Sequence, residues 1–68
     1  MDIETTYLRQ VEDLLTGKPQ VIQAIAFSKK SSQWLLIDTT EKKVTTELSS
    51  GLASDIVRVW TDHGQLKI

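Results

Sequence analysis

The pattern of apolar and polar positions predicts a helix over the first sixteen residues. At 100° per residue, the apolar side chains fall within an arc of about 140° on a helical wheel. These side chains are Ile3, Tyr7, Leu8, Val11, Leu14 and Leu15. Asp2 is a suitable N-cap, and Gly17 followed by Pro19 is typical of a helix end.

Three short strands are expected next. Residues 21–27 and 33–39 are rich in β-branched and aromatic side chains, which favour strands. Residues 43–48 alternate between apolar and polar positions, as a half-exposed strand does. The polar stretches 28–32 and 40–42 separate these segments and predict turns.

Residues 50–62 give two conflicting signals. Several of their apolar residues prefer strands, yet at 100° per residue all of them share an arc of about 160°. They are Leu52, Ala53, Ile56, Val57, Val59 and Trp60. A serine at position 49 or 50 is a possible cap, and His63-Gly64 suits a helix end. We expect a helix here; the alternative is a β-hairpin over residues 55–68. In either case residues 65–68 form a last short strand.

These elements predict a small two-layer α+β domain over residues 1–68, with the order α-β-β-β-α-β and an antiparallel meander. The alternative, with a hairpin at residues 55–68, has one helix followed by five strands.

The first two predicted strands are apolar on both faces, which a one-sided antiparallel sheet would not require. A chain of 68 residues without cysteine has little material to cover a second face. We therefore predict that one face meets another chain, and that the protein is a homodimer. The candidate interface consists of Ile22, Ala24, Trp34 and Leu36, with Trp60 as a possible anchor. A monomer with one helix on each face is the alternative.

Composition and charge narrow the functional classes. The chain has no cysteine and a single histidine, so disulfides and zinc sites built on cysteine are excluded. We predict no catalytic, cofactor-binding or metal-binding residues. Its apolar runs are too short to span a membrane, and its acidic N-terminal residues do not resemble a leader, so we expect a cytoplasmic protein.

The preferred function is a small non-enzymatic regulator or adaptor that acts by protein–protein interaction. The alternative is a nucleic-acid-binding regulator, with contacts from Lys29, Lys30, Lys42, Lys43 and Arg58. The net charge of −1 and the pI near 5.7 disfavour that alternative. A small enzyme would need Asp38, Asp62 and His63 to meet in one site, and nothing in the sequence brings them together.

Overall fold

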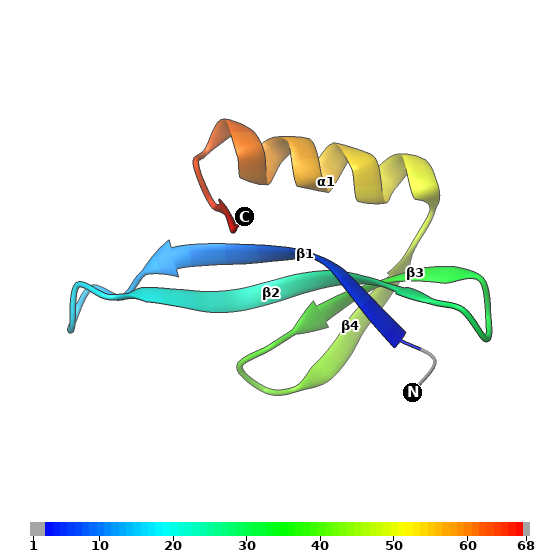
Figure 1. Ribbon diagram of the computed structural model, residues 1–68, viewed down its shortest axis with the longest axis horizontal. Helices are drawn as coiled ribbons and strands as arrows, with labels where there is room; N and C mark the ends of the chain where they lie inside the picture. The colour runs from blue at the N-terminus through cyan, green and yellow to red at the C-terminus, as the bar shows by residue number, and fades with distance from the viewer. Residues whose placement is uncertain (1–2, 68) are drawn as a thin grey trace.

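The computed structural model describes the backbone of residues 3–67 and the side chains of residues 7–67. The element order is β-β-β-β-α-β (Figure 1). The strands are β1 (Ile3–Glu12), β2 (Pro19–Ser28), β3 (Gln33–Asp38), β4 (Lys43–Leu48) and β5 (Leu66–Lys67), and the helix α1 (Ser50–Asp62) precedes β5. The strands form one five-stranded antiparallel sheet in the order β4-β3-β2-β1-β5.

The predicted fold class is wrong, because the N-terminal segment is strand β1 and not a helix. Its pairing with β2 contains two register shifts, one at Thr6 in β1 and one at Ile22 in β2. A bulge of this kind takes one residue out of the strict alternation of a strand. Tyr7 and Leu8 lie on opposite faces of β1, and together with Leu14 and Leu15 of the following turn they imitate a helical spacing. The proposed N-cap, Asp2, lies outside the described residues.

The helix expected at residues 50–62 is confirmed as α1, and the alternative hairpin over residues 55–68 is wrong. The Oγ atom of Ser49 accepts a hydrogen bond from the backbone N–H of Leu52 at 3.1 Å, which makes Ser49 the N-cap. After the C-cap residue His63, Gly64 takes a φ of 67°, where a residue without a Cβ is favoured. The periodicity of the apolar residues therefore outweighed their strand propensity.

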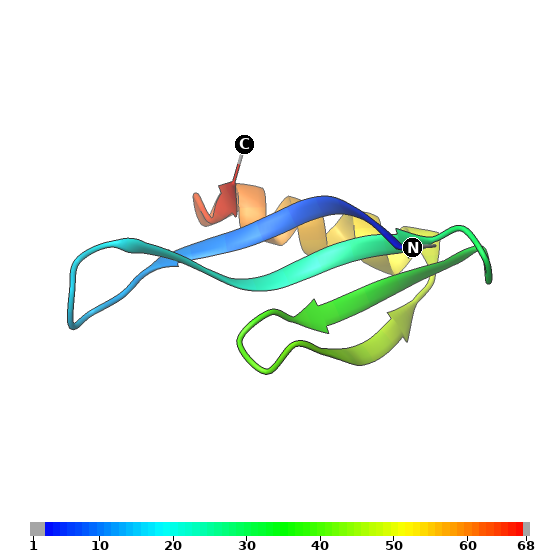
Figure 2. The ribbon, with the colours of Figure 1, turned by 60° about the horizontal axis from the view of Figure 1, so that its bottom comes forward.

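Helix α1 lies on one side of the sheet, and Figures 1 and 2 show it there from two directions. The core between these layers contains Ile25, Leu48, Ala53 and Trp60, all buried. Trp34 and Leu36 of β3, together with Leu66 of β5, pack against this core. We call this side of the sheet the helix face and the opposite side the open face.

The short strand β5 joins the C-terminal part of the chain to the middle of β1, through the pairs Leu8↔Lys67 and Arg9↔Leu66. Side chains strengthen this junction. The Nε atom of Arg9 donates to Oε1 of Gln65 at 2.8 Å, and its Nη1 atom donates to Oε1 of Gln23 at 2.6 Å. The guanidinium of Arg9 thus connects β1, β2 and the segment before β5.

Candidate interaction surfaces

The open face of the sheet is apolar across four neighbouring strands. Residues that are directly opposite in paired strands have side chains on the same face. One row across the open face consists of Lys67, Leu8, Ala24, Ile37 and Val44, from β5 to β4. A second row contains Ala26, Leu35 and Glu47. The single helix lies on the other face and leaves these rows uncovered within the described part of the chain.

The centre of the open face is occupied by alanines. Ala24 and Ala26 are buried although no second layer covers them. Their neighbours in the rows, Leu8, Leu35 and Ile37, have longer side chains that flank the two methyl groups, and each of these neighbours is half-buried. At the edge strand β4, Val44 remains 48% exposed. The longer side chains therefore cover the two alanines and form the apolar surface of the open face.

The five residues predicted as an interface do not form one surface. The pairs Phe27↔Trp34 and Ile25↔Leu36 place Trp34 and Leu36 on the helix face, where they pack against the core. Trp60 points into the same core from α1 and is 4% exposed. Ala24 lies on the open face, and Ile22 occupies the bulge of β2. The sequence showed that both faces were apolar but did not reveal the register that assigns each residue to a face.

A different surface, the tip of the β1–β2 hairpin, was missed. The tip consists of residues 13–18, and Figure 1 shows it projecting beyond the end of the helix. Leu14 and Leu15 within it are 98% and 96% exposed. On the helical wheel both leucines fall in the apolar arc of the predicted helix. The available signal was local, since the leucines are followed by Gly17 and Pro19, which are turn residues as well as helix terminators.

Hydrogen bonds hold the tip in one conformation. The backbone N–H of Asp13 donates to the carbonyl of Lys18 at 2.9 Å, and that of Gly17 donates to the carbonyl of Asp13 at 2.7 Å. The backbone N–H of Leu15 donates to Oδ1 of Asp13 at 2.8 Å. Gly17 has a φ of 70°, a conformation that favours glycine. These hydrogen bonds define the turn that carries the two leucines.

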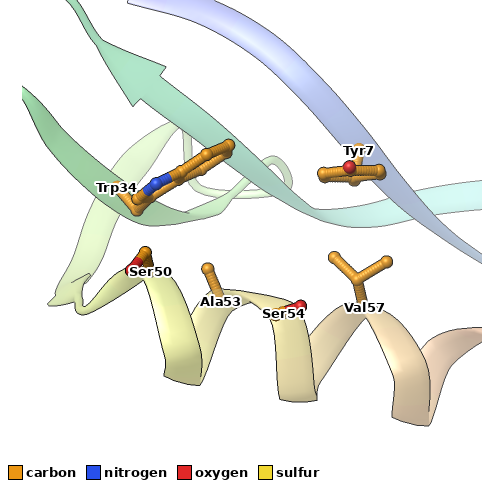
Figure 3. Close-up of a pocket in the computed structure, with 6 residues that line it drawn as sticks. All are labelled: Tyr7, Trp34, Ser50, Ala53, Ser54 and Val57. Carbon is orange, nitrogen blue, oxygen red and sulfur yellow. The ribbon is translucent and has the colours of Figure 1, made fainter.

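A small pocket lies between the helix and the sheet, as Figure 3 shows. Its volume is about 140 Å³. The rings of Tyr7 and Trp34 line it from the sheet, and Ala53 and Val57 line it from the helix. The remaining lining residues are Ser50 and Ser54. These side chains suit a small apolar group, and they include no carboxylate, imidazole or amine for acid–base catalysis near neutral pH.

The basic residues of the alternative function are distributed over separate parts of the fold. Lys29 and Lys30 lie in the β2–β3 turn, whereas Lys42 and Lys43 lie where the β3–β4 turn enters β4. The two turns are at opposite ends of β3, about 20 Å apart at ~3.3 Å per residue. Lys43 pairs with Glu41 at 2.7 Å, and Arg58 on the helix faces Asp55 at 3.9 Å. The fold does not gather these residues into one basic patch.

The residues considered for catalysis are also separated by element. Asp38 ends β3, where its Oδ1 atom accepts hydrogen bonds from the backbone N–H groups of Thr40 and Glu41. Asp62 and His63 lie at the end of α1. The described residues contain no group of three or more His, Cys, Asp or Glu side chains that could hold a metal ion. No helix among them has the length and apolar character needed to cross a membrane.

Comparison of the chain with protein-family models, with curated proteins and with solved structures finds no match.

Proposed function

We propose that the protein is a small, non-enzymatic cytoplasmic adaptor or regulator that docks on a protein partner through its hairpin tip. The observation that carries this proposal is the near-complete exposure of Leu14 and Leu15 at the tip. Burying a leucine side chain is worth about 1.5–3 kcal/mol. Two adjacent leucines therefore offer about 3–6 kcal/mol to a partner with a matching apolar pocket.

The hydrogen bonds within the tip support a docking role. Ordering a flexible loop on binding costs free energy that lowers the affinity. Here the Asp13 carboxylate and the backbone hydrogen bonds of Gly17 and Lys18 already form the turn in the free chain. A partner would bind the leucines without ordering the loop first.

The charges around the tip favour a protein over an anionic lipid surface. Glu12 and Asp13 carry two carboxylates there, against one ammonium group on Lys18. A membrane-binding segment of this size would need basic residues to be attracted by anionic headgroups. The surroundings of the two leucines instead suit an apolar protein pocket with a polar or basic rim.

The test compares a tip variant with a control of equal chemistry at another site. In the double variant Leu14→Ser/Leu15→Ser, we expect the fold to be unchanged, because both side chains are already in solvent. The control is Leu52→Ser/Val59→Ser, which removes two half-exposed apolar residues from the flank of α1.

Each tagged protein is expressed in its native host, and the proteins that cross-link to it are quantified. Partners that the wild type and the control retain should be lost from the tip variant. Binding of the purified partner should then weaken by at least about 10-fold, for about 1.4 kcal/mol or more of lost burial. Equal recovery of every partner by the wild type and the tip variant would refute the docking role of the tip.

A further inference from the structure

We propose that the open face is covered by a second copy of this chain, so that two sheets pack face to face about a twofold axis. This inference is independent of the hairpin tip, which is a separate surface. It rests on the thin core of the single chain, on the distribution of small and large side chains, and on the charges at the two edges of the face.

The core of one chain is small. Among the residues whose side chains the structure describes, the buried apolar ones are Ala24, Ile25, Ala26, Leu48, Ala53 and Trp60. Half of these are alanines, and Ile25 is the one large side chain among the described residues that is completely enclosed. A single core of this size supplies little stability, and burial against a partner subunit is one way in which small domains gain more. A second copy of the chain can supply this burial, and it is available wherever the protein is expressed.

The shape of the open face suits its own copy. The central strand β2 carries Ala24 and Ala26, while its neighbours carry Leu8, Leu35 and Ile37. The largest overlap of two five-stranded sheets puts the twofold axis over the central strand. The longer side chains of β1 and β3, which already cover the alanines in each copy, then meet those of the second copy at the ~10 Å spacing of packed sheets.

The charges at the edges of the open face select the direction of the axis. Glu47 is on edge strand β4, and Lys67 is on edge strand β5. A twofold axis that runs along the strands lays β4 of one copy over β5 of the other, which brings opposite charges to each edge. An axis across the strands would lay β4 over β4 and place Glu47 near its own copy. Complementary charges favour the first arrangement.

The area of the face sets the strength of the dimer. Five strands at ~4.8 Å spacing and about five residues at ~3.4 Å give a face of roughly 19 by 17 Å, or about 300 Å² per copy. Interfaces of stable dimers usually bury about 800 Å² per partner. The open face is smaller than this, so we expect a weak, reversible dimer that forms at high micromolar protein concentrations.

The experiment uses two valines with nearly the same exposed fraction. Val44 lies on the open face and is 48% exposed, and Val59 lies on the flank of α1 and is 50% exposed. In the proposed dimer Val44 lies over Lys67 of the second copy, because the two residues share one row of the face. Val44→Lys should weaken dimerisation at least about 10-fold through loss of apolar contact and repulsion between like charges.

Val44→Glu, which places a carboxylate opposite Lys67, should weaken the dimer less than Val44→Lys does. Neither Val59→Lys nor Val59→Glu should change the Kd, which sedimentation equilibrium measures across the micromolar range. In the wild type, the melting temperature should rise with protein concentration, because association stabilises the folded chain. The tip variant Leu14→Ser/Leu15→Ser should dimerise like the wild type.

A wild-type protein that stays monomeric at several hundred micromolar and melts at a concentration-independent temperature would overturn the inference. A dimer that Val59→Lys weakens as much as Val44→Lys would also overturn it. Neither result would affect the test of partner binding, which uses the tip variant Leu14→Ser/Leu15→Ser. Failure of the dimer proposal is therefore distinguishable from failure of the proposed function.

Discussion

Truncation of Trp60 is the sharpest test of how the helix is held on the sheet. Its indole is 4% exposed and packs in the core with Ile25 and Leu48. Replacing a buried tryptophan by alanine costs about 3–5 kcal/mol. A domain of 68 residues has a total stability of about 3–10 kcal/mol, at ~0.05–0.15 kcal/mol per residue. Trp60→Ala should therefore remove about a third or more of the free energy of unfolding, and at the lower end of this range it leaves the chain unfolded.

Trp60→Phe gives a graded version that remains measurable. Phenylalanine keeps an aromatic ring but buries ~50–80 Å² less apolar surface, which corresponds to about 1–2 kcal/mol at ~25 cal/mol per Å². The slope of the free energy of unfolding in urea for small domains is ~1 kcal/mol per M. The urea midpoint should therefore fall by about 1–2 M.

Urea unfolding followed by far-ultraviolet circular dichroism, at one fixed protein concentration, measures the effect. Fluorescence of the remaining Trp34, which packs against the same core, gives a second probe. Val59→Ala is the control and should change the free energy of unfolding by less than about 0.5 kcal/mol, because Val59 is half exposed. If Trp60→Ala unfolded at the wild-type midpoint, Trp60 would not be a core residue, and the docking of α1 described above would be incorrect.

The same urea assay checks three smaller changes. Ser49→Ala removes the N-cap of α1 and should lower the free energy of unfolding by about 1 kcal/mol; no change would mean that the cap is dispensable. Gly17→Ala places a Cβ on a residue with φ 70° and should lower it by about 1 kcal/mol. Gly51→Ala adds a Cβ within α1 that meets no atom within 4 Å, and it should raise the free energy of unfolding by about 0.5–1 kcal/mol. Effects of equal sign at the two glycines would contradict the conformations assigned to them.

The second half of the chain was predictable because its signals are local. The turn residues after β2 and β3, the alternation in β4 and the apolar arc of α1 each fall within a few consecutive residues. Ser49 and Gly64 limit the helix at both ends, and the capping preferences of serine and glycine are properties of the residues themselves. Boundaries set by such residues can be read without knowledge of the tertiary structure.

The first strand was not predictable in the same way, because its irregularities depend on its partner. The bulges at Thr6 and Ile22 exist only in the pairing of β1 with β2. Tyr7 and Leu8 lie on opposite faces of β1, so its apolar residues do not alternate with polar ones. The faces of Trp34 and Leu36 also depend on pairing. A shift of one residue between β2 and β3 would have moved both side chains to the open face. The predicted interface failed to form one surface for this reason.

The junction of β1 with β5 has a consequence for the order in which the fold forms. Strands β1 to β4 pair with their neighbours in sequence, and such local pairings require little loop closure. Arg9 and Gln65, in contrast, are 56 positions apart in the chain, and their contact closes a long loop at a correspondingly larger entropic cost. We expect the four-stranded meander to form first and β5 to be added last. Amide protons of β5 should accordingly exchange with solvent faster than those of β2. The hydrogen bonds of Arg9 to Gln65 and Gln23 then stabilise the completed sheet.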